Sequence, residues 1–194
     1  MVSLRDIAEE NEHFLRRYRD FRRAADAVAT AWSARSDVLK VVLIGSLARV
    51  PWKEVCRHNP YRRKGIELWH ECKDVDLALW LTDLAGLDEI RRAKDRTLRE
   101  FKGELGGGVA NHQIDIFVLE PGSDRYLGRL CSFSTCPKQK LECLAPGCGA
   151  VRFLRQYDDF EWWPRTIASD PTLCLFDRAT GARARAADLP LPTP

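Results

Sequence analysis

The sequence has no long hydrophobic run and no excess of charge of one sign. Its longest apolar stretches, residues 41–44 and 77–81, are far too short to span a membrane. Residues 1–10 are polar and charged, and they lack the apolar centre of a secretory signal. The 31 basic and 28 acidic residues leave a net charge of +3, which is too balanced to make nucleic-acid binding the default interpretation. We therefore expect a cytoplasmic protein with no membrane partner.

The composition also lacks the signs of global disorder and of internal repeats. Hydrophobic residues make up 45% and charged residues 30% of the 194 positions, as is typical of a soluble globular protein. This length favours one domain, or one domain with an appended module. Seven cysteines are present. In a cytosolic chain, clustered cysteines more often bind a metal or lie buried as thiols than form disulfides.

Hydrophobic periodicity predicts an α/β (α+β) fold in which helices flank a small mixed β-sheet. Apolar residues at gaps of three and four predict an amphipathic helix over residues 3–33, with Ser3 and Asp6 as a capping box. Alternating apolar residues predict strands over residues 38–45, 74–81 and 113–119. The arginines of the first helix are expected on a solvated face: Arg16, Arg17, Arg19, Arg22 and Arg23.

A second helix is expected between the last two strands. Its apolar residues run from Leu84 to Leu105, Thr82 or Asp83 is expected to cap it, and Gly106 to end it. The chain then divides into a leading helix that packs on the core, a central core with a basic insertion, a cysteine-rich extension and a disordered tail. Their ranges are 1–37, 38–119 with the insertion at 49–73, 120–188 and 189–194.

Three aspartates are placed where strand geometry can bring them together. Alternation puts Asp74 and Asp76 on one face of one strand, and Asp115 on the outer face of the next. If the two strands pair, three carboxylates converge and repel one another, which favours a divalent cation among them. Oxygen ligands suit Mg²⁺ or Mn²⁺. The alternative is that all three simply face solvent on the wet side of a sheet.

These residues, taken with Gly45-Ser46, resemble the nucleotidyltransferase superfamily related to DNA polymerase β. That family's pattern is an apolar strand ending in Gly-Ser, then an acidic-apolar-acidic triplet, then an acidic residue between apolar neighbours on a later strand. Here it reads Gly45-Ser46, Asp74-Val75-Asp76 and Ile114-Asp115-Ile116, within residues 38–119. Leu47-Ala48-Arg49 also resembles the Gly-Ser-x-Ala-Arg version of the minimal nucleotidyltransferase branch.

The resemblance implies transfer of a nucleoside monophosphate from an NTP to an acceptor hydroxyl, with release of pyrophosphate and help from two metal ions. By matching position, Gly45 and Ser46 would bind the triphosphate. Asp74 and Asp76 would bridge the metals, and Asp115 would complete the acceptor-side metal site. Arg49 is either a phosphate contact or a surface arginine. The acceptor is open: tRNA, a protein or a small molecule, with a partner protein as a further source of binding surface.

The insertion at residues 49–73 departs from the family pattern, which usually crosses this distance with one short helix and a turn. It carries seven basic and three acidic residues, a local charge of +4. Two interpretations are open: a mouth that holds a triphosphate or a nucleic-acid backbone, or a solvated loop. The residues suited to phosphate contact are Arg57, His58, Tyr61, Arg62, Arg63 and Lys64.

Four cysteines in the extension have a spacing that suits a structural Zn²⁺. Cys131, Cys136, Cys143 and Cys148 are separated by four, six and four residues, without a Cys-x-x-Cys knuckle. Scattered thiols are the main alternative, and a redox disulfide is another. A second possible zinc set is Cys56, His58, His70 and Cys72, although His70 could instead shape the catalytic pocket. We expect His112 to be structural and Cys174 to lie in the core.

Two function classes therefore follow from the sequence. The first is a nucleotidyltransferase with an unknown acceptor. The second is a non-catalytic module that binds RNA or a protein on a degenerate nucleotidyltransferase scaffold with a structural zinc site. The presence of all three acidic positions favours the enzyme.

Overall fold

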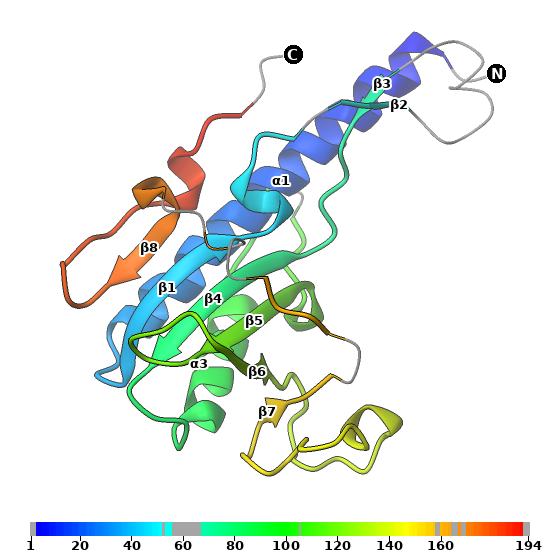
Figure 1. The fold of residues 1–194 in the computed structure, drawn as a ribbon. Coiled ribbons are helices and arrows are strands. Elements are labelled where there is room, and N and C mark those ends of the chain that lie inside the picture. Colours follow the sequence, from blue (N-terminus) through cyan, green and yellow to red (C-terminus); the bar gives the residue numbers. More distant parts are fainter. Residues whose placement is uncertain are drawn as a thin grey trace.

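The computed structural model describes residues 3–51, 53–55, 67–104, 106–157, 160–163, 167 and 170–191 (Figure 1). A mixed sheet of six strands, in the order β7-β6-β5-β4-β1-β8, forms its centre. The strands are β1 (Val38–Ile44), β4 (Val75–Leu81), β5 (Ile114–Leu119), β6 (Tyr126–Leu130), β7 (Leu154–Arg155) and β8 (Cys174–Asp177). The expected α+β class with a mixed sheet is confirmed.

Two helices lie behind the sheet in the view of Figure 1: α1 (Leu4–Ser33) and α3 (Leu87–Glu100). The indole of Trp32 on α1 donates a hydrogen bond of 3.0 Å to the Ile90 carbonyl on α3, which joins the two helices. The expected capping box is confirmed, because the Ser3 hydroxyl accepts from the Asp6 backbone and the Asp6 carboxylate accepts from the Ser3 backbone. Short 3₁₀ turns occur at Ser46–Ala48, Asn111–Gln113, Leu141–Cys143, Pro171–Leu173 and Ala186–Asp188.

β4 and β5 are parallel and are connected through α3. The other neighbouring strands of the sheet are antiparallel. A parallel pair needs such a crossover connection. Its register places Asp76 opposite Asp115. On β4, the alternate residues Val75, Leu77, Leu79 and Leu81 are all buried, as the pattern predicts. Asp76, which alternates with these residues, therefore lies on the opposite face of the sheet.

The start of α3 differs from the expectation. The helix begins at Leu87 with Gly86 as its N-cap, and neither Thr82 nor Asp83 caps it. The Asp83 carboxylate accepts a hydrogen bond of 2.8 Å from the Ala85 backbone, so it stabilises a turn before the helix. The helix ends at Glu100, and Phe101 is extended. Leu105 lies outside the described residues.

Arg22 corrects the expectation that all arginines of α1 face solvent. It is only 2% exposed, and its guanidinium lies over the Tyr18 ring. It donates hydrogen bonds to the Leu47 carbonyl (3.4 Å) and the Leu189 carbonyl (2.7 Å). Arg22 is buried because the turn after β1 and residues 189–190 lie against this part of the helix. Residues 192–194, the rest of the expected tail, lie outside the described residues.

Parts of the insertion and of the extension contribute strands. β2 (Lys53–Val55) and β3 (Glu67–Trp69) pair antiparallel as a separate two-stranded sheet. The Trp69 backbone donates to the Asn11 side chain on α1 at 2.8 Å, which fixes this ribbon to the helix. Strands β6, β7 and β8, from residues 120–188, extend the main sheet at both edges. Residues 56–66, with the basic side chains expected to contact phosphate, lie outside the described residues.

Candidate active site

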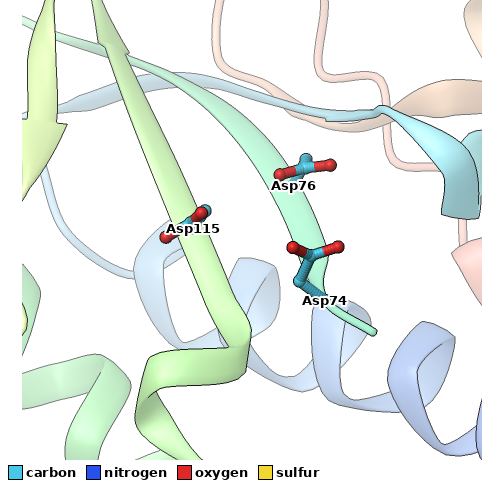
Figure 2. Close-up of side chains that lie close together, drawn as sticks. All are labelled: Asp74, Asp76 and Asp115. Atoms are coloured by element: carbon cyan, nitrogen blue, oxygen red, sulfur yellow. The ribbon is translucent and has the colours of Figure 1, made fainter. Parts of the chain in front are cut away.

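The three predicted aspartates lie together at one end of β4 and β5 (Figure 2). Asp76 is on β4, Asp115 is its register partner on β5, and Asp74 directly precedes β4. One carboxylate oxygen from each lies within 4.8 Å of the other two. Among the described residues this is the only group of three His, Cys, Asp or Glu side chains that meets this spacing. The sheet therefore brings together the residues that the sequence placed on one face.

Burial and charge both act on Asp76. Burial, followed by the negative charges of Asp74 and Asp115, raises the pKa of its carboxyl from 3.8 to about 7, although Arg129 partly opposes the rise. The carboxylate form of Asp76 is thus destabilised by its neighbours, and a cation between the three groups would relieve that repulsion. An all-oxygen donor set of this kind fits Mg²⁺ or Mn²⁺.

The raised pKa of Asp76 predicts that the stability of the metal-free protein depends on pH. Because the folded-state pKa of about 7 is above the ordinary value of 3.8, protonation of Asp76 favours the folded state. Its stabilising contribution is complete below pH 3.8 and is lost as the pH rises to about 7. We expect the melting temperature in EDTA to fall between pH 5 and 7.5, and Mn²⁺ to restore it at pH 7.5. Calorimetry checks this, and a cation that has no effect at pH 7.5 would contradict it.

Gly45 lies against Asp76 at the end of β1. Its backbone has a φ of 73°, a left-handed conformation that favours glycine. A Cβ atom at this position would lie 2.2 Å from the Asp76 carboxylate, far inside van der Waals contact. The register pair of Ile44 and Asp76 explains this closeness. Glycine is therefore required here both by the turn and by the carboxylate beside it.

The turn after Gly45 is held in place by Tyr18 of α1. The buried Tyr18 hydroxyl lies 3.3 Å from the Ser46 carbonyl and 3.2 Å from the Leu47 carbonyl, and it also contacts the Arg49 carbonyl. Burial raises the pKa of Tyr18 to about 12, so its hydroxyl stays protonated and able to donate. The Arg49 side chain is exposed. α1 thus fixes the backbone of Gly45 and Ser46, the residues expected to hold phosphate.

Cys72 lies just before β4 in the chain and contacts the Ser46 side chain. It is 4% exposed, shares a hydrogen bond with the Ser46 hydroxyl, and burial raises the pKa of its thiol. Of the second predicted zinc set, Cys56 and His58 lie outside the described residues. Cys72 packs in the hydrophobic core and does not form a group of three potential ligands within the described part of the chain.

Arg129 is a site residue that the sequence analysis missed. Its Nη1 donates to Oδ2 of Asp115 at 2.8 Å, from a side chain that is 19% exposed. The guanidinium stacks near the rings of Phe117 (4.4 Å), Tyr157 (4.8 Å) and Phe160 (4.8 Å). No strand was predicted at β6, so the pairing of Arg129 with Phe117 across β5 and β6 had no signal in the sequence.

Lys94 is a second residue that the sequence analysis missed. It is 1% exposed on α3, and its ammonium donates to the carbonyls of Asn111 (3.2 Å) and Ile114 (3.1 Å). Burial lowers its pKa to about 8, although the charges of Asp95 and Asp115 oppose that change. Lys94 therefore fixes the first residue of the strand that carries Asp115. Its position four residues from both Ile90 and Leu98, on the apolar face of the helix, is the signal that indicates burial.

The four cysteines of the extension lie in one segment between β6 and β7. Cys131 is buried and the other three are partly exposed. The described cysteines are all free thiols. Their sulfurs do not meet the ligand spacing of the aspartates in the part of the chain that the structure describes. Cys174 is half-buried on β8, on the opposite edge of the sheet.

Comparisons with protein-family models, with curated proteins and with solved structures found no match to this chain. Within the described residues, no helix combines the length and the apolar character needed to cross a membrane. The function of this protein is therefore inferred from the geometry and chemistry of the aspartate site.

Proposed function

We propose that this protein is a nucleotidyltransferase that moves a nucleoside monophosphate from an NTP to an acceptor hydroxyl and releases pyrophosphate. The observation that carries the proposal is the convergence of Asp74, Asp76 and Asp115 within 4.8 Å, beside a glycine turn that ends the neighbouring strand. In the family pattern the three acidic residues must lie together in space. Three unrelated solvent-facing aspartates would have no reason to converge.

Each part of the site has a role in this reaction. Asp74 and Asp76 would hold two Mg²⁺ or Mn²⁺ ions, and Asp115 would add a ligand on the acceptor side. Bound ions of this kind neutralise phosphate charge and lower the pKa of an attacking hydroxyl. The left-handed Gly45 allows the backbone to approach the triphosphate closely, and Ser46 presents a hydroxyl next to it. Phosphoryl transfer requires mainly such positioning and charge neutralisation.

Arg129 supports this assignment. Its hydrogen bond uses Oδ2 of Asp115, so the other carboxylate oxygen can reach a cation. The guanidinium also lowers the local negative charge, which keeps three carboxylates together before an ion binds. The exposed Arg49 at the end of the phosphate turn is a candidate contact for the triphosphate tail.

The test is Mg²⁺-dependent transfer of labelled nucleotide, with each of the four NTPs, to tRNA, to protein and to small-molecule acceptors from cell extract. Wild type is compared with the double variant Asp74→Asn/Asp76→Asn. We expect labelled product and pyrophosphate from wild type only, and weaker Mg²⁺-dependent NTP binding by the variant. NTP binding that is equal in the two proteins, with turnover in neither, would overturn the catalytic proposal and favour the non-catalytic binding module.

A further inference from the structure

The thiols of the cysteine segment are arranged around backbone N–H groups. The Phe153 backbone donates to the Cys136 sulfur at 3.2 Å, and the Phe133 backbone donates to the Cys131 sulfur. The Cys143 sulfur accepts from two backbone groups, those of Lys138 and Lys140. A neutral thiol is a weak acceptor. Four such hydrogen bonds on three sulfurs indicate a chain folded to surround negatively charged sulfur.

Two of these sulfurs are linked through one residue. The Cys131 backbone donates to the Phe153 carbonyl at 2.8 Å, while the Phe153 backbone donates to the Cys136 sulfur. Phe153 is buried and adopts a φ of 65°, a conformation that costs a non-glycine residue free energy. The structure thus holds Cys131 and Cys136 on either side of a strained backbone segment. Cys143 lies close enough to Cys131 for its charge to act on that thiol.

One cationic side chain lies near two of these thiols. The positive charge of Arg155 acts on both Cys131 and Cys143. Its Nε is buried and has no hydrogen-bond partner in the described part of the chain. Four thiolates around a divalent cation carry a net charge of −2, and the Arg155 guanidinium would compensate part of it.

The middle of the segment turns large apolar side chains to solvent, although Phe133 and Val151 near its ends pack against the main core. Leu141 is 84% and Leu144 is 73% exposed. Cys148 sits between Gly147 and Gly149, both with positive φ values of 78° and 85°, so its side chain is presented by a tight turn. Short segments without a core depend on cross-links or metals for their stability.

We propose that Cys131, Cys136, Cys143 and Cys148 bind one structural Zn²⁺ as four thiolates. In the structure the sulfurs are not yet within mutual ligand distance, since among the described residues only the aspartates have three ligand atoms within 4.8 Å. Binding therefore draws the loop between β6 and β7 together and releases the thiol protons. A tetrahedral site of this kind selects Zn²⁺ over the oxygen-preferring ions expected at the aspartates.

The zinc site also acts on the neighbouring carboxylates. Cys131 directly follows β6, two residues after Arg129, and β7 pairs with β6 through Arg129 and Arg155. A metal that fixes the loop between these strands therefore fixes the guanidinium that contacts Asp115. This consequence rests on the proposed function, whereas zinc binding itself does not.

The test is the metal content of the full chain, purified in reducing buffer without chelator. We expect one zinc per chain, and Co²⁺ substitution to give the visible absorption of a tetrahedral thiolate site. Cys143→Ser and Cys148→Ser should each weaken zinc binding by more than about 100-fold. Cys174→Ser is the matched control and should bind zinc like wild type, as should Asp74→Asn/Asp76→Asn, which separates this proposal from the catalytic one.

A second measurement covers the case in which the serine variants do not fold. Titration of wild type with a mercurial reagent should release the zinc in step with the modification of four thiols. Protein without zinc, protein with iron in its place, or zinc that is retained after Cys143→Ser in folded protein would each overturn the proposal.

Discussion

Replacing Asp76 with asparagine is expected to abolish nucleotide transfer and, at the same time, to make the metal-free protein more stable. Burial, followed by the negative charges of Asp74 and Asp115, destabilises the Asp76 carboxylate and raises its pKa to about 7. Asparagine has nearly the same shape without the charge. We expect a gain on the order of 2 kcal/mol in the free energy of unfolding above pH 7. The gain should shrink as the pH falls from 7 and should vanish below 3.8, where Asp76 is protonated in both the folded and the unfolded state.

The loss of activity should be about 10³-fold or more, because each 1.36 kcal/mol of lost transition-state stabilisation costs a factor of ten and a metal supplies several kcal/mol. Asp124→Asn is the control, since Asp124 is exposed and outside the aspartate group. Denaturant unfolding in EDTA and a transfer assay in Mg²⁺ measure the two effects. A variant that is less stable than wild type at pH 8 would contradict the electrostatic account of this site.

Replacing Gly45 with alanine is the second change with a large expected effect. The new Cβ would need the space of the Asp76 carboxylate, 2.2 Å away, and the residue would have to keep a φ of 73°. We expect displacement of Asp76 and a loss of transfer activity of about 100-fold, the effect of a misplacement of about 1 Å at a reacting centre. Stability should also fall by about 1–3 kcal/mol from the backbone strain alone, because a φ of 73° with a ψ of −153° is a conformation that essentially only glycine adopts.

Gly122→Ala is a control that separates strain from collision. Gly122 has the same φ of 73°, but nothing lies within 4 Å of its added Cβ. It should therefore lose stability through backbone strain and keep its activity. Equal activity losses in the two variants, measured by transfer rates at saturating NTP, would show that the contact between Gly45 and Asp76 has no role in the site.

The candidate site could be located from the sequence because strand alternation is a local property. Once Val75 and Leu77 are assigned to the buried face, Asp74 and Asp76 follow on the other face. The same alternation places Asp115 between Ile114 and Ile116. The turn at Gly45 was likewise visible, because glycine readily adopts the backbone conformations that a tight turn after a buried strand requires.

The residues that support the site could not be found in this way. Arg129 reaches Asp115 only because β6 pairs with β5, and the short strand at residues 126–130 has no distinctive alternation. Arg22 looks like a surface residue on a charged helix, yet carbonyls from Leu47 and Leu189, far away in the sequence, surround its guanidinium. Asp83 was expected to cap α3, but its carboxylate accepts a hydrogen bond from the Ala85 backbone in the turn before the helix.

The sequence by itself determined the α+β class, the strands that carry the aspartates and the face on which each aspartate lies, because these depend on neighbours within a few residues. Only the tertiary structure decided that Asp76 and Asp115 are register partners, that Gly45 touches Asp76, and that Arg129 and Lys94 stabilise the strand of Asp115. Those contacts join residues from different strands and helices, and their geometry is set by sheet register and by packing of the core, which no local pattern encodes.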